Sequence, residues 1–102
     1  MIQQTFLSVV PSRALTDKRL TSDEKIILCQ IYMLLNQQGF CRATNTDFAN
    51  LNDVTERTIR RWLKSLQDKN YIKIEYIENN GKKIKVIMPL SDLGETWKNA
   101  QN

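Results

Sequence analysis

The 102-residue sequence has no histidine, two cysteines and three isolated glycines. Without histidine there is no imidazole base, no Ser-His-Asp or Cys-His catalytic arrangement and no histidine-ligated metal. Cys29 and Cys41 are too few for a thiolate zinc site, and we expect no disulfide between them in the cytosol. Gly39, Gly81 and Gly94 stand alone, which excludes a glycine-rich phosphate loop. An enzyme would have to use carboxylates or a borrowed cofactor, and we expect a protein that is not an enzyme and uses no cofactor or metal.

Long hydrophobic runs and a targeting segment are also absent. The longest apolar run, Ile31–Leu35, is far shorter than the roughly 20 residues that a membrane-spanning helix needs. The first residues, MIQQTFLSVVPSR, have no basic region before their short apolar patch, so we expect no signal peptide. These features predict a cytoplasmic protein with no membrane partner. The length suits one small domain with a single core.

The positive charge is concentrated in one part of the chain. The formal net charge is +4, from 15 Lys+Arg and 11 Asp+Glu. Between positions 55 and 85 lie nine basic and four acidic residues, a net +5, whereas the rest of the chain has a net charge of −1. A solvated lysine-rich surface would also give such a run, so a nucleic-acid interpretation depends on where the fold places the cations.

Two elements are predicted in the first part of the chain. Thr5–Val10 is rich in β-branched residues and ends at Pro11, which is typical of an edge strand. A loop or single helical turn then leads to a helix over residues 22–37, with Ser22 as its N-cap and Gly39 after its end. This helix is apolar around most of its circumference, so we expect it to be the buried centre of the domain.

A short helix over Asn45–Leu51 comes next. Thr44 is its expected N-cap, and Asp47 three residues later completes a capping box. Asn52 and Asp53 form the turn that follows, because both residue types tolerate left-handed backbone.

The third helix, residues 55–69, has two different faces. Four apolar residues at i, i+3, i+4 and i+7 form one stripe, which is expected to be buried: Ile59, Trp62, Leu63 and Leu66. The opposite face is cationic and is flanked by Thr58 and Arg60; its members are Arg57, Arg61 and Lys64. Asn70 is expected to end the helix in the left-handed conformation.

Two strands, Tyr71–Glu78 and Lys82–Met88, flank the turn NNG and predict a β-hairpin over residues 72–88. A two-residue turn would pair Asn79 with Lys82, whereas a three-residue loop would pair Glu78 with Lys82. We expect the three-residue loop, because it places the apolar residues of the two strands opposite one another.

The order of elements predicts an α+β fold, a winged helix-turn-helix (β-α-α-α-β-β) over residues 1–90. Its three-helix core carries the hairpin as a wing, and residues 91–102 form a C-terminal tail, frayed or partly helical. The third helix would enter the major groove of double-stranded DNA, where an arginine can form two hydrogen bonds with a guanine. The second helix would face a phosphate with its N-terminus, and the wing would lie along the backbone or a minor groove. The predicted DNA-binding residues are Thr44, Asn45, Thr55, Arg57, Thr58, Arg60, Arg61, Lys64, Lys82 and Lys83.

Residues 43–74, ATNTDFANLNDVTERTIRRWLKSLQDKNYIKI, resemble the winged helix-turn-helix at the N-terminus of Gram-positive phage and plasmid replication proteins, the replisome organisers and replication initiators. The likeness covers about residues 6–88 and implies DNA binding in replication initiation. Asn52-Asp53 and Asn70 depart from the family, which has glycine at these turns. Family members usually continue into a further domain, so this chain is either a DNA-binding domain of a longer protein or a small separate protein. A homodimer and a replication-protein partner both remain open.

Three alternatives to a replication protein are compatible with parts of the sequence. Small transcriptional regulators contain similar modules. A protein-interaction module could dock through helix 22–37, if apolar surface remains near Tyr32 or Met33, but a cationic third helix is costly to desolvate against most proteins. A metal-dependent nuclease would need carboxylates, and those close in sequence are better explained as cap and turn residues: Asp47, Asp53 and Glu56.

Overall fold

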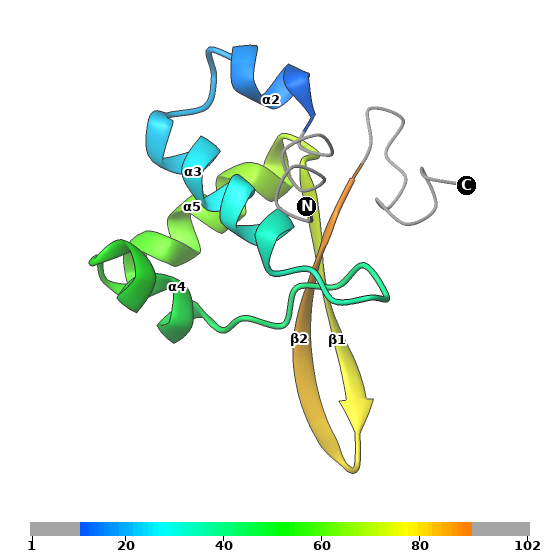
Figure 1. The fold of residues 1–102 in the computed structure, drawn as a ribbon. Helices are drawn as coiled ribbons and strands as arrows, with labels where there is room; N and C mark the ends of the chain where they lie inside the picture. Colours follow the sequence, from blue (N-terminus) through cyan, green and yellow to red (C-terminus); the bar gives the residue numbers. More distant parts are fainter. Residues whose placement is uncertain (1–10, 91–102) are drawn as a thin grey trace.

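The computed structural model describes residues 11–90, in which four helices precede an antiparallel hairpin (Figure 1). The elements are α2 (Ser12–Thr16), α3 (Ser22–Met33), α4 (Asn45–Asn52), α5 (Glu56–Asp68), β1 (Ile72–Asn79) and β2 (Lys82–Pro89). The helices gather on one side, and the hairpin extends beyond them as a wing (Figure 1). This layout confirms the predicted α+β winged helix-turn-helix. The predicted strand Thr5–Val10 and the tail 91–102 lie outside the described residues.

Helix α3 begins with a capping box whose N-cap is Thr21, so the prediction of Ser22 is wrong. The Thr21 hydroxyl accepts a hydrogen bond from the backbone N–H of Glu24 at 3.1 Å. The Glu24 carboxylate accepts one from the N–H of Thr21 at 2.9 Å. A glutamate three residues after Thr21 satisfies a second backbone donor, which no residue can do for Ser22 in the same way.

Helix α3 ends at Met33, four residues before the predicted Gln37. The chain then turns so that Leu35 and Cys41 form a bridge. Cys41 also exchanges two backbone hydrogen bonds with Ile87 of β2, at 2.8 and 2.9 Å. This segment leaves the helix because its backbone pairs with itself and with the hairpin.

The core lies between α3, α4, α5 and the base of the hairpin. Its fully buried side chains include Ile27, Ile31, Phe48, Ile59, Leu66 and Ile87. The predicted stripe on α5 is confirmed, although Trp62 is only half-buried. Helix α3 is less buried than expected, because Ile26 and Met33 are 50% and 59% exposed, while Tyr32 is buried.

The hairpin has the register that follows from a two-residue turn, so the predicted three-residue loop is wrong. Asn79 pairs with Lys82, and Asn80 and Gly81 form the turn at φ 54° and 79°. Two successive left-handed residues match the right-handed twist of the strands, and Asn-Gly is the preferred sequence for such a turn. Two isoleucine pairs still lie across the strands in this register. Turn chemistry and apolar pairing are therefore both satisfied.

Candidate nucleic-acid interface

The α4–turn–α5 unit is held by hydrogen bonds from short polar side chains. Thr44 and Asp47 form the predicted capping box, with bonds of 3.0 and 2.9 Å between each side chain and the other residue's N–H. Asp53 turns the chain in the left-handed conformation at φ 56°. The Thr55 hydroxyl then caps α5 by accepting from the N–H of Thr58 at 3.2 Å. All three predicted DNA-binding threonines therefore take part in the N-caps of the two helices.

The outer face of α5 carries the exposed cations that the sequence places there: Arg57, Arg60, Arg61 and Lys64. Lys64 forms an exposed ion pair with Asp68 one helical turn later, at 3.5 Å. Within residues 11–90, no carboxylate forms an ion pair with any of the three arginines. Their guanidinium groups are thus available to an external anion.

The wing separates the two lysines predicted at its tip. Alternate residues of a strand project to opposite faces, so Lys82 and Lys83 do not share a face. Lys83 lies on the face that looks toward the helices, together with its neighbour two residues on, Lys85. Lys82 is exposed on the other face. The structure therefore brings Lys83, but not Lys82, beside the helical part of the interface.

Two adjoining hollows lie between the wing and the helices. One, of about 480 Å³, lies beside the N-termini of α4 and α5, and Arg42 and Lys83 are among its lining residues. The other, of about 310 Å³, lies between α5 and the wing and is lined in part by Arg60. Asn45, Tyr76 and Lys85 line both hollows. The two therefore meet and make a cationic groove, a name used below for both hollows together.

Asn45 holds the wing in place. It is half-buried at the first position of α4, and its side-chain oxygen accepts a hydrogen bond from Nζ of Lys85. Burial lowers the pKa of the Lys85 ammonium. The bond joins the wing to α4 at the floor of the cationic groove, so Asn45 has a positioning role that the sequence did not reveal.

Three residues of this groove were not predicted from the sequence: Arg42, Tyr76 and Lys85. Arg42 precedes the charged stretch at positions 55–85, so the charge count does not single it out. Tyr76 and Lys85 are cross-strand partners only in the observed register. A shift by one residue moves a side chain to the opposite face, and the predicted register paired Tyr76 with Ile84 instead.

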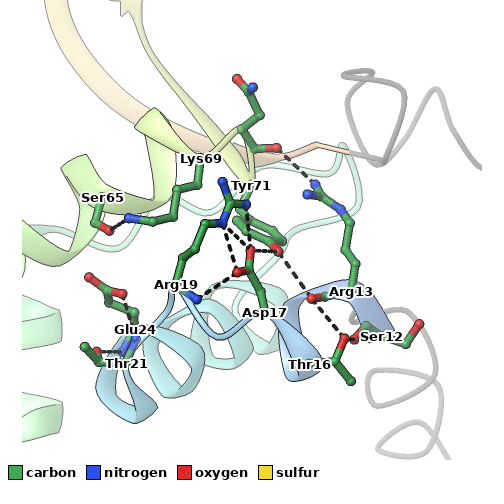
Figure 2. Close-up of polar contacts among 11 residues, drawn as sticks. Ser12, Arg13, Thr16, Asp17, Arg19, Thr21, Glu24, Ser65, Lys69 and Tyr71 are labelled. Atoms are coloured by element: carbon green, nitrogen blue, oxygen red, sulfur yellow. Dashed lines mark hydrogen bonds and ion pairs between the residues drawn. The ribbon is translucent and has the colours of Figure 1, made fainter.

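A polar cluster anchors the base of the wing (Figure 2). The buried Tyr71 donates its hydroxyl hydrogen to Asp17 at 2.7 Å, and Arg19 forms an ion pair with the same carboxylate at 2.7 Å. These two partners, Arg19 first, hold the pKa of Asp17 well below its usual range. Arg13 lies over the Tyr71 ring at 4.0 Å and donates to the carbonyl of Asn70 at 3.0 Å. The segment containing α2 is thereby tied to the junction of α5 and β1.

The carboxylates that were candidates for a nuclease site take part in hydrogen bonds, a cap and a turn. Glu56 accepts a hydrogen bond from the Thr46 hydroxyl at 2.6 Å, while Asp47 and Asp53 serve the cap and the turn. Within residues 11–90, no cluster of three metal-ligating side chains occurs. Both cysteines are free thiols. None of the helices in this range has the length and apolarity needed to cross a bilayer.

Comparison with known proteins identifies the family. A family model described as a helix-turn-helix domain matches residues 18–72, which is more than half of the chain and spans α3, α4 and α5. Searches of curated proteins and of solved structures gave no significant match. The match agrees with the helices followed by a two-stranded hairpin, and it supports DNA as the partner. The chain belongs to the helix-turn-helix domain family.

Proposed function

We propose that the protein binds double-stranded DNA and catalyses no reaction, with α5 in the major groove and the wing along the adjoining backbone or minor groove. The observation that carries the proposal is the face of α5 with three exposed arginines, none of which has a carboxylate partner within the described residues. The opposite face of α5 is buried in the core, which holds the helix in place with its cations facing outward. A major groove about 12 Å wide admits a helix presented in this way.

The exposed groups divide into two proposed roles. Arg57 and Arg61 are one turn apart and are the proposed base readers, because a planar guanidinium can contact guanine O6 and N7 together. Lys64 lies on α5 with the arginines, and Lys83 and Arg42 line the hollow beside the N-terminus of α5, so these three cations are proposed phosphate contacts. The Thr58 and Thr55 hydroxyls lie 3.1 Å apart and serve the cap, so we assign them to positioning α5.

Replication initiation is the proposed biological role, supported by the resemblance of residues 43–74 to phage and plasmid replication proteins. Transcriptional control would use the same DNA-binding surface and is the alternative. Mapping the DNA that the tagged protein occupies in its host cell separates the two roles. Occupancy at a replication origin supports the first, and occupancy confined to promoters supports the second.

The DNA-binding proposal is tested by fluorescence anisotropy with a labelled random-sequence duplex at several salt concentrations. We expect binding that weakens steeply with salt, because cations displace counterions from the phosphates, and no binding by the Arg57→Glu/Arg61→Glu variant. The control is Lys18→Glu/Lys73→Glu, which changes the net charge equally. Lys18 is exposed between α2 and α3, and Lys73, which is paired with Glu75, is exposed at the base of the hairpin on the face away from the helices. Absence of binding by the unaltered protein at low salt, or equal losses in the two variants, would contradict the proposal.

A further inference from the structure

Tyr76 is an exposed aromatic residue that the fold does not explain. It lies in the outer half of β1, its side chain is 66% exposed, and it is not part of the hydrophobic core. Its ring is nevertheless directed to the helix side of the hairpin, because it lines both hollows of the cationic groove. Tyrosine combines an apolar ring with a polar hydroxyl and is enriched at interfaces, so this exposed ring offers surface that a partner could cover.

The surroundings of Tyr76 are predominantly cationic. Its cross-strand partner is Lys85, Lys83 and Arg42 line the hollow on one side, and Arg60 lines the hollow on the other. The one carboxylate among the lining residues is Glu56, which is engaged with Thr46. An aromatic ring between positive charges matches the sugar–phosphate backbone, in which an apolar deoxyribose face alternates with an anionic phosphate.

Resting on the proposed function, we infer that Tyr76 contacts the DNA backbone. Its ring packs against a deoxyribose, and its hydroxyl donates a hydrogen bond to a phosphate oxygen, as tyrosine hydroxyls can. Sugar and phosphate are the same in every nucleotide, so this contact positions the wing without reading sequence. The hydrogen bond between Lys85 and Asn45 ties β2, beside Tyr76, to α4 and thereby limits the movement of the wing relative to the helices.

The neighbouring Ile77 provides a matched control. It is also exposed, at 38%, but the alternation of side chains along β1 places it on the hairpin face away from the helices. Removing either side chain takes apolar surface from the same strand. Only Tyr76 adjoins the cationic groove.

The experiment measures anisotropy with labelled random-sequence duplexes at several salt concentrations. We expect Tyr76→Phe to weaken binding about threefold, because one hydrogen bond to a phosphate oxygen is lost from an exposed position where water can replace the hydroxyl. Tyr76→Ala should weaken it about tenfold, because the contact area of the ring is lost as well. For each variant, the loss of affinity should be the same on unrelated DNA sequences. The salt slope should stay unchanged, since no charge is removed. Ile77→Ala should bind like the unaltered protein.

Failure of this inference can be told from failure of the proposed function. If the unaltered protein binds, Arg57→Glu/Arg61→Glu does not, and both Tyr76 variants bind normally, the inferred contact is overturned while DNA binding stands. If the unaltered protein does not bind duplex, both fall. If Tyr76→Ala lowers the midpoint of thermal unfolding, Tyr76→Phe decides the matter: a threefold loss supports the contact and normal binding overturns it.

Discussion

Helices α3 and α5 pack against the same core but present different outer faces. Ile27 and Ile31 of α3 are as completely buried as Ile59 of α5. Outside the core, α3 leaves apolar side chains such as Ile26 in water, whereas α5 leaves arginines. The two helices are therefore similarly buried on one side but differ on the other. The exposed face of α5 is cationic and suits a polyanion, whereas the exposed face of α3 carries apolar side chains and the acidic Asp23.

The outer face of α3 is also interrupted by a polar contact. Gln30 lies between Ile26 and Met33 along the helix, and its side chain exchanges two hydrogen bonds of 2.9 Å with Asn52 of α4. Part of this surface is therefore used to hold α4, which carries the turn to α5. The difference between the helices indicates that α3 supports the helix-turn-helix unit, whereas α5 exposes the cationic face that would contact DNA.

The largest expected effect is on stability and comes from removing a buried side chain from either helix. Ile31→Ala and Leu66→Ala each remove a completely buried side chain, one from α3 and one from α5. Each should lower the free energy of unfolding by about 2–5 kcal/mol, because a cavity is left in the shared core. Urea denaturation measures this, and a loss below about 1 kcal/mol in either variant would contradict the burial described here.

The next effect separates the outer faces. Arg57→Ala and Arg61→Ala should each weaken binding to a cognate site by about 1–3 kcal/mol while changing random-duplex binding less. Both arginines are exposed, so the free energy of unfolding should change by less than about 0.5 kcal/mol. Anisotropy on cognate and random duplexes measures the difference, and equal losses on both would remove the arginines as base readers.

A pH-dependent effect concerns the anchor at the base of the wing. The pKa of Asp17 is lowered in the folded protein, so the ionised carboxylate stabilises the fold above its ordinary pKa. This stabilisation is lost as pH falls toward the lowered value. Asp17→Asn should therefore unfold at lower urea than the unaltered protein at pH 7, and the gap should narrow below about pH 4. A gap independent of pH would contradict an ionised Asp17 in this cluster.

A smaller effect sharpens the role of the wing. Lys83→Ala should weaken binding to all duplexes about equally and reduce the salt slope by about one unit, because one phosphate contact is lost. Lys82→Ala is the comparison on the opposite face of the hairpin. Equal salt slopes for the two variants would contradict the placement of Lys83 alone beside the helices.

The smallest effect is expected on α3. Met33→Ser removes a side chain that is 59% exposed, so it should change neither duplex affinity nor, beyond about 0.5 kcal/mol, the free energy of unfolding. Anisotropy and urea denaturation measure both quantities. A strong loss of duplex binding would place DNA on α3 and reverse the distinction between the two helices.

Much of the α4–α5 unit could be predicted because its determinants are local. The capping box of Thr44 and Asp47 and the cap at Thr55 depend on residues three positions apart. Asp53 and Asn70 adopt the left-handed conformation where the sequence has turns without glycine. Short polar side chains satisfy the backbone at these points whatever the distant packing.

The predicted hairpin register was wrong because the prediction gave too little weight to the conformation of the turn. Apolar pairing favoured a three-residue loop, but the dihedral angles of Asn80 and Gly81 suit a two-residue turn that matches the strand twist. The single-residue shift also places Lys85 opposite Tyr76. The groove beside α5 therefore could not be foreseen from the predicted register.

Other differences arise from contacts between distant parts of the chain. The end of α3 at Met33 reflects the pairing of Cys41 with Ile87, which is 46 positions away in sequence. The residues around Met33 do not by themselves predict this pairing. Arg42 joins the cationic groove because the same segment runs from the hairpin to α4. Periodicity within one helix does not contain such information.

The contrast between α5 and α3 is tested most directly by recording amide ¹H–¹⁵N spectra while a DNA duplex is added. We predict that the shifted amides concentrate in the first two turns of α5 and at Lys83–Lys85 of the wing, with the outer face of α3 unchanged. Shifts concentrated around Ile26 and Met33, with α5 unchanged, would contradict the assignment of α5 as the DNA-binding helix.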